Sequence, residues 1–217
     1  MKKSKGMKIY KEVFSPIDVN TFIITGDDLS CIVIDCGCYG KREEKRLADL
    51  LSSLKLVPVL LLNTHCHLDH IFGNGVMLEK YGLRSWFHEG EKYNHLTSPK
   101  HAIMFGLTME PPPEPAGYLS DGEIITSAGL DLEVIAVPGH SSGGIAFYSR
   151  ENGVIFTGDA LFAGSIGRSD LPGGNHQQLL DNIRNRLFTL PPETVVYPGH
   201  GPETTIGEEI RSNPFFS

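Results

Sequence analysis

The sequence predicts an α+β fold in which two mixed β-sheets pack together and helices cover their outer faces. In the first half of the 217-residue chain, short β-branched runs and helical spacings follow one another in the order βββαβαβ. The second half repeats this kind of pattern, which indicates a second, similar layer. Hydrophobic residues make up 40% and charged residues 21% of the chain, which excludes a wholly disordered, collagen-like or coiled-coil protein. Because this length suits one large domain, we expect a single domain over residues 1–217.

The first half of the chain supplies the elements of one sheet. Apolar, β-branched runs predict strands at 7–14, 19–25 and 30–35, with a hairpin turn at Gly26, Asp27 and Asp28. Apolar residues at positions 47, 50, 51 and 54 have helical spacing and predict a helix over 41–54. The continuous apolar run 57–63 is typical of a strand that is covered on both faces. A short helix over 76–81 and a strand over 84–87 complete this half.

The second half begins after a break in the pattern. Residues 97–121 contain a run of prolines and predict an irregular insertion, either a packed surface loop or a linker, lid or substrate wall. The elements expected after it are strands at 132–137, 144–149 and 154–156, an amphipathic helix over 176–187, a strand over 194–197 and a short helix over 206–210.

Residues 64–70, which read Thr-His-Cys-His-Leu-Asp-His, form the strongest chemical signal in the sequence. They directly follow the apolar strand predicted at 57–63. In an extended segment alternate side chains share one side, so His65 and His67 point together. A following turn brings Asp69 and His70 to a neighbouring point. A single tetrahedral ion cannot easily use all four groups of so short a segment, so two adjacent metal positions are expected.

Three further segments share one pattern, in which an apolar strand is followed by a tight turn and then by one metal-ligating side chain. The ligating residues are His140, Asp159 and His200, and a glycine directly precedes each of them. Glycine permits a tight turn and a close approach of the backbone. Each side chain is therefore expected just beyond a strand end, where it joins the cluster at 64–70.

These motifs resemble those of the metallo-β-lactamase superfamily, and the resemblance extends over nearly the whole chain. It implies the four-layer αββα sandwich of that family and two divalent metal ions with a bridging water or hydroxide. Zinc is the expected metal, and imidazole and carboxylate ligands also accept iron or manganese. The resemblance assigns one ion to His65, His67 and His140, the other to Asp69, His70 and His200, and a bridging position to Asp159. Asp69 and Asp159 are also the expected catalytic carboxylates.

Within the superfamily the chain is most similar to short bacterial glyoxalase II, a hydroxyacylglutathione hydrolase. The similarity rests on residues 156–162, 167–170, 201–207 and 213–216. It implies hydrolysis of small S-2-hydroxyacylglutathione-like thioesters. Arg168 stands where that family places a lysine for a substrate carboxylate, and an arginine can bind a carboxylate through two hydrogen bonds. The alternative role for Arg168 is an ion-paired arginine with Asp170 as its partner.

Other functions remain open on the sequence alone. Persulfide dioxygenases share the fold and hold one iron, which would bind here to His65, His140 and Asp159. A non-catalytic metal-binding module is a further alternative. A nuclease of the same superfamily needs a basic surface for nucleic acid, and the net charge of −7 argues against it. No cysteine lies near Asp159, which disfavours a β-lactamase with a cysteine ligand.

The charge and the apolar runs also set an expectation for location and partners. The longest apolar stretch, 56–62, contains Pro58 and is too short to span a bilayer. The basic residues 1–6 are not followed by an apolar run, so they do not resemble a signal peptide. We therefore expect a soluble, cytoplasmic protein that binds a small thioester, with no nucleic-acid or membrane partner.

Overall fold

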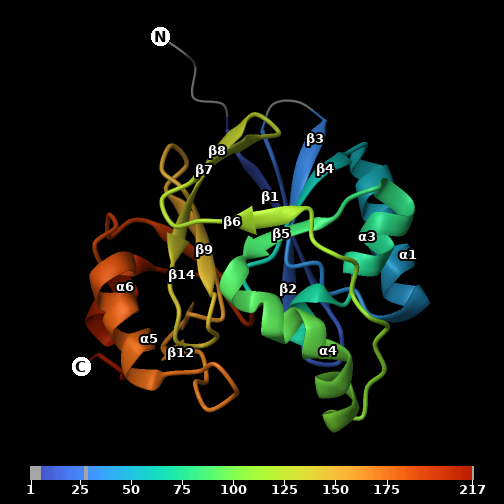
Figure 1. Cartoon of the computed structure of the whole chain (residues 1–217). Coiled ribbons are helices and arrows are strands. Elements are labelled where there is room, and N and C mark those ends of the chain that lie inside the picture. Colours follow the sequence, from blue (N-terminus) through green and yellow to red (C-terminus); the bar gives the residue numbers. More distant parts are fainter. Residues whose placement is uncertain (1–5, 27–28, 217) are drawn as a thin grey trace.

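The computed structural model describes residues 6–26 and 29–216, and it confirms the predicted sandwich of two mixed sheets with helices outside (Figure 1). Each of the two large sheets has six strands. Most of the predicted hairpin turn, Asp27 and Asp28, lies outside the described residues, as do the basic residues 1–5. Among the described helices, none combines the length and apolar character that crossing a membrane requires.

The first sheet is formed by the N-terminal half of the chain in the spatial order β1-β2-β3-β4-β5-β6. Its first three strands are antiparallel and the remaining pairs are parallel. Helices α1 and α3 cover its outer face through a shared apolar cluster. The strands are β1 (Lys8–Phe14), β2 (Val19–Thr25), β3 (Ser30–Ile34), β4 (Val57–Leu62), β5 (Ser85–His88) and β6 (Gly117–Leu119), and the helices of this half are α1 (Gly40–Leu54), α2 (Leu68–Ile71), α3 (Asn74–Tyr81), η1 (Glu89–Glu91) and α4 (Lys92–Met104).

The second sheet has the order β14-β13-β10-β9-β8-β7, in which only β10 and β13 are parallel neighbours. Helices α5, η2 and α6 cover its outer face. Its strands are β7 (Ile124–Ser127), β8 (Leu130–Ala136), β9 (Ile145–Ser149), β10 (Val154–Gly158), β13 (Val195–Pro198) and β14 (Thr204–Thr205); a small separate sheet pairs β11 (Leu161–Phe162) with β12 (Ser165–Ile166), and the helices are α5 (His176–Asn182), η2 (Ile183–Leu187) and α6 (Ile206–Ser212).

The core between the sheets follows from the two-residue period of the strands. Phe22 and Ile24 of β2 point into this core, whereas Ile23 between them packs under the helices on the other face. Phe22 meets Phe156 of β10 across the core with ring centroids 5.1 Å apart. Both faces of β2 are buried along its whole length, including its polar residues Asn20, Thr21 and Thr25.

The predicted irregular insertion over 97–121 is wrong for its first part. Residues up to Met104 belong to helix α4, and Gly117–Leu119 forms strand β6 at the edge of the first sheet. Pro99 lies inside α4 without breaking it. A proline cannot donate to the carbonyl four residues earlier, and here the hydroxyl of Ser98 donates to that carbonyl of His95 instead.

Candidate metal centre

The cluster at 64–70 leaves strand β4 at one end of the sandwich and changes from an extended to a helical conformation. His67 is extended, with φ −65° and ψ 150°, and the four-residue helix α2 begins directly after it. The extended part presents His65 and His67, and the helical turn presents Asp69 and His70. The backbone carbonyl of Thr64 also accepts a hydrogen bond from Ile145 of the second sheet, which joins the two sheets at this point.

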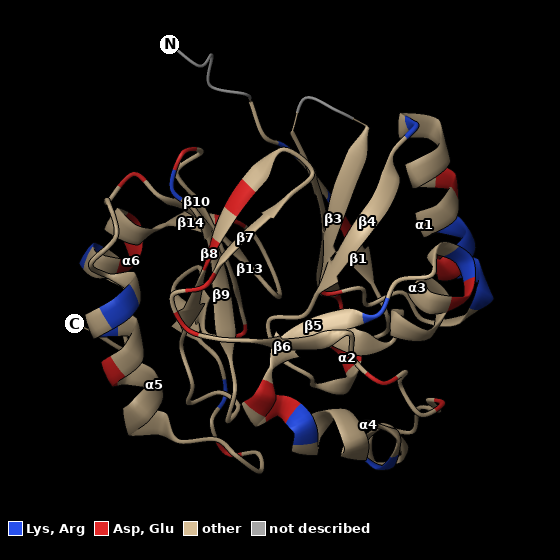
Figure 2. Cartoon of the chain, turned by 45° about the horizontal axis from the view of Figure 1, so that its top comes forward, with Lys and Arg blue, Asp and Glu red and all other residues tan. Residues whose placement is uncertain are grey.

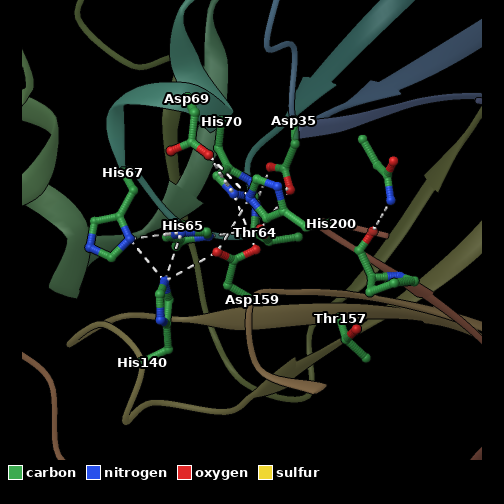
Figure 3. A network of polar contacts seen from close by, with 12 residues as sticks. Asp35, Thr64, His65, His67, Asp69, His70, His140, Thr157, Asp159 and His200 are labelled. Atoms are coloured by element: carbon green, nitrogen blue, oxygen red, sulfur yellow. Dashed lines mark hydrogen bonds and ion pairs between the residues drawn. The ribbon is translucent and has the colours of Figure 1, made fainter. Parts of the chain in front are cut away.

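The first group of donor atoms consists of three imidazoles (Figure 3). His140 Nε2 lies 2.8 Å from His67 Nδ1 and 3.2 Å from His65 Nε2. The remaining pair, His65 Nε2 and His67 Nδ1, is 3.1 Å apart. Three ring nitrogens that converge so closely are arranged to share one cation.

The second group consists of Asp69, His70 and His200. His200 Nε2 lies 3.1 Å from Asp69 Oδ2, and His70 Nε2 lies 3.6 Å from the same oxygen. His200 follows β13 and comes from the far end of the chain. An oxygen and two ring nitrogens again converge on one point.

Asp159 lies between the two groups. Its Oδ2 is 3.6 Å from His140 Nε2 of the first group and 3.6 Å from His200 Nε2 of the second. Its Oδ1 is 3.2 Å from His70 Nε2. Gly199 permits this arrangement, because a Cβ at that position would lie 2.2 Å from Asp159 Oδ1.

Two of the histidines are oriented by Asp35, a buried carboxylate at the end of β3. Asp35 Oδ2 lies 3.0 Å from His70 Nδ1 and accepts the hydroxyl proton of Thr64 at 2.7 Å. With its own proton given to Asp35, the Thr64 hydroxyl is left to accept from His65 Nδ1, 3.1 Å away. Both imidazoles therefore carry their proton on Nδ1 and turn the Nε2 lone pair toward the centre of the site.

Backbone carbonyls orient two more of the histidines. His140 Nδ1 donates to the carbonyl of Arg168 at 2.6 Å, and His200 Nδ1 donates to the carbonyl of Asp18 at 3.0 Å. Since a carbonyl only accepts, the proton is on Nδ1 in both rings. The two Nε2 atoms are left as electron-pair donors, which is the state in which imidazole binds a metal.

Two buried atoms of the site lack a hydrogen bond within the described part of the chain. They are His70 Nε2 and Asp159 Oδ1, which face each other. Unpaired buried polar atoms are costly, so native proteins rarely leave them without a partner. A cation between the two groups would satisfy both atoms, and the donor set therefore fits a pair of divalent ions.

The protonation states of the ligating groups agree with this interpretation. Burial lowers the pKa of His67 to about 4 and that of His65 well below its ordinary value, so both rings are neutral near neutral pH. Burial alone would raise the pKa of Asp159, but His70 outweighs it and holds this pKa well below the usual range. Burial alone would lower the pKa of His70, and the surrounding carboxylates, Asp159 first, raise it instead. A bound cation competes with that proton, so metal affinity falls at low pH.

The sequence reasoning missed Glu91, which holds the ligand loops together. Its fully buried carboxylate accepts the backbone N–H of Cys66 at 3.0 Å and that of Gly143 at 2.7 Å. Cys66 lies between His65 and His67, and Gly143 follows His140. No local pattern marks Glu91, because its two partners lie 25 and 52 positions away in the sequence. Asp35 was also missed as a residue that orients two of the ligands, although it directly follows a buried strand.

The family assignment comes from comparison with known proteins. Residues 15–200 match the model of the metallo-beta-lactamase superfamily. This chain belongs to that superfamily. It is 37% identical to the hydroxyacylglutathione hydrolase GloC of Haemophilus influenzae over 205 residues, and this alignment covers 91% of this chain and 92% of the relative. It is 35% identical to the probable metallo-hydrolase YqgX of Bacillus subtilis, with 97% of this chain and 98% of the relative covered.

Solved structures of the superfamily are equally similar. The di-iron-bound form of TTHA1623 superimposes with a TM-score of 0.85 at 36% identity, covering 95% of this chain and 99% of that one. The B3 metallo-β-lactamase BLEG-1 superimposes with a TM-score of 0.89 at 31% identity, covering 97% and 100%. Together with the histidine and aspartate groups, these relatives make the chain a metal-dependent hydrolase of the superfamily with a site for two ions.

A cavity of about 730 Å³ opens over this superfamily site. Its floor includes His67, Asp69, His140, Asp159 and His200, and its walls come from α4, β11 and the segment before α5. His101 and Met104 of α4 line it, which agrees with the idea of a substrate wall for part of the segment 97–121. Arg168 lines it as well, but its guanidinium forms two 2.8 Å hydrogen bonds with Asp170, as the alternative role predicted.

Proposed function

We propose that this hydrolase is a binuclear thioesterase of the glyoxalase II type, which cleaves S-2-hydroxyacylglutathione-like thioesters. In this proposal His65, His67 and His140 would hold one ion, Asp69, His70 and His200 would hold the other, and Asp159 would serve both. One observation carries it: two groups of three donor atoms each are joined by the carboxylate of Asp159, and members of both groups line a cavity sized for a small molecule.

The metal ions would supply the central chemistry, since two adjacent divalent cations lower the pKa of a shared water and polarise a substrate carbonyl. The residues of the chain prepare the site for this. Asp35 and the two backbone carbonyls fix the ring orientations, so little reorganisation is needed when substrate binds. In the metal-free chain His70 holds the pKa of Asp159 low, and in the loaded site the two cations would take over this role and keep Asp159 ionised.

Asp69 is proposed to orient the attacking water. It lines the cavity, and its Oδ2 lies 3.1 Å from His200 Nε2. Burial alone raises its pKa, but His70 and His200 outweigh this effect and lower it. An ionised Asp69 accepts a hydrogen bond from the water and keeps a lone pair of that water directed toward the thioester carbonyl. No serine or cysteine nucleophile is required, and the thiolate leaves directly.

The thioester assignment is supported by the relative GloC, whose name states hydroxyacylglutathione hydrolysis and whose similarity extends over nine-tenths of both chains. A second candidate is β-lactam hydrolysis, because BLEG-1 is described as a B3 metallo-β-lactamase and its structure is equally similar. Both reactions hydrolyse the bond between a carbonyl carbon and its leaving group. The metal site alone therefore does not distinguish them, and the substrate preference must be measured.

The test is a substrate panel on protein loaded with zinc, iron or manganese. It contains S-lactoylglutathione, a β-lactam, and glutathione persulfide with O₂ uptake measured. We expect hydrolysis of the thioester to be the fastest reaction, and we expect His65→Ala and Asp159→Ala to abolish it. Full thioesterase activity in either variant, or faster β-lactam hydrolysis or persulfide oxidation by the wild type, would contradict the proposal.

A further inference from the structure

We infer that the C-terminal end of α4 selects the substrate by binding an apolar group on the thiol side of the thioester. Met104 and Phe105 form this binding surface. The inference rests on the proposed thioesterase function and revises its thiol: the site still hydrolyses 2-hydroxyacyl thioesters, glutathione thioesters included, but it prefers an apolar thiol to the charged tripeptide glutathione.

The walls of the cavity are predominantly apolar. Phe162 of β11, together with Leu171 and Pro172 before α5, lines the same cavity as Met104 and Phe105. Figure 1 shows α4 and the chain segment before α5 at the same end of the molecule. A 2-hydroxyacyl group is too small to fill about 730 Å³, so most of this volume is left for the thiol.

The charges around the cavity do not fit glutathione. Glutathione carries two carboxylates, which cationic side chains bind most strongly. Among the described lining residues, Arg168 is the one lysine or arginine, and Asp170 already holds its guanidinium through two hydrogen bonds. Figure 2 shows basic residues on both α1 and α4. Neither those of α1 (Lys41, Arg42, Lys45 and Arg46) nor Lys92 and Lys100 of α4 are among the residues that line the cavity.

The buried face of helix α4 is largely polar, and its exposed face carries large apolar residues, which is the reverse of the pattern expected for a helix that only packs against the core. Its buried positions include Asn94, His95 and Ser98, whereas Met104 and Phe105 are 81% and 54% exposed. Exposed apolar groups that gather at a cavity are typical of a binding site. Methionine is unbranched and adapts to irregular apolar partners.

The position of α4 relative to the metal centre is fixed. Glu91, directly before α4, binds the ligand loops through the N–H groups of Cys66 and Gly143. Asn94 donates to the same carboxylate at 2.9 Å and also lines the cavity. An apolar group bound at the far end of α4 therefore lies at a defined distance from the proposed catalytic ions.

The test compares two lactoyl thioesters, one of benzyl mercaptan and one of glutathione, on the metal-loaded protein. We expect kcat/KM to be about tenfold higher for the benzyl thioester. The double variant Met104→Ser/Phe105→Ser should lower that value about tenfold and change the glutathione value less than about twofold. The matched control is Leu96→Ser/Ile103→Ser, which changes two exposed apolar residues of the same helix that do not line the cavity, and it should change neither value.

Dissociation constants of the corresponding thioethers, in which CH₂ replaces the carbonyl, give a second measurement that does not depend on turnover. A wild-type preference for glutathione, or an equal loss for both thiols in the Met104/Phe105 variant, would overturn the inference. If neither thioester is hydrolysed, the proposed thioesterase function fails, and the thioether dissociation constants separately decide whether α4 binds an apolar group.

Discussion

Replacing Glu91 with glutamine tests whether one buried carboxylate holds the ligand loops in place. The carboxylate accepts three hydrogen bonds, from Cys66 N, Gly143 N and Asn94 Nδ2, at 3.0, 2.7 and 2.9 Å. Glutamine keeps one acceptor oxygen and places an NH₂ group where the other oxygen stood. At least one buried N–H then faces another donor and loses its partner.

The magnitude follows from these contacts. A hydrogen bond to a charged group contributes about 1.5–3 kcal/mol, and leaving a buried donor unpaired costs about 1–3 kcal/mol. Since one bond is lost and the other two weaken, we expect Glu91→Gln to lower the free energy of unfolding by about 3 kcal/mol. The loops that carry His65 and His140 would also separate, so the variant should retain less metal after dialysis.

Urea unfolding of the metal-free proteins measures the first effect, and elemental analysis after dialysis measures the second. Glu89→Gln is the matched control, because Glu89 is exposed and pairs with Lys92 on the surface. An unfolding free energy for Glu91→Gln equal to that of Glu89→Gln, with unchanged metal retention, would refute the reasoning.

Three further predictions address the metal site and its surroundings. Gly199→Ala places a methyl group 2.2 Å from Asp159 Oδ1, so elemental analysis should show loss of bound metal, whereas Gly75→Ala, which meets nothing within 4 Å, should keep it. Treatment with a chelator should lower the Tm, and a thousandfold excess of zinc over its Kd should restore about 4 kcal/mol of stability; an unchanged Tm would argue against a folded-state site. Burial alone raises the pKa of Asp121, but a backbone N–H and Arg186 outweigh it and lower this pKa. The carboxylate therefore stabilises the fold above its unfolded pKa of about 4 and loses this effect as the pH falls through its lower folded pKa, so Asp121→Asn should reduce stability in urea at pH 7 and by progressively less as the pH falls below about 4.

The sequence predicted most of the longer strands and the ligand segments because both have local signals, whereas the short strands β6, β7, β11, β12 and β14 were not predicted. A continuous apolar run followed by a histidine-rich segment identified β4 and residues 64–70. Glycine before His140, Asp159 and His200 marked strand ends, and the ends of β10 and β13 meet because these strands are parallel neighbours.

The sequence failed where the deciding contacts are long-range. Helix α4 was not predicted because its buried face is polar, with Asn94, His95 and Ser98, so the usual apolar periodicity is absent. Glu91 could not be predicted, since its role depends on two loops that only the folded chain brings together. The edge strand β6 has three residues, too few for a pattern to emerge.

The central claim is that the chain holds two metal ions in two ligand groups that share Asp159. Its most direct test is the metal content per chain, measured by elemental analysis after reconstitution, for the wild type and for His67→Ala and His200→Ala, one variant from each group. We predict two ions in the wild type and one in each variant. One ion in the wild type, kept in His200→Ala and lost in His67→Ala, would contradict the account, because it would leave the group of Asp69, His70 and His200 without a metal.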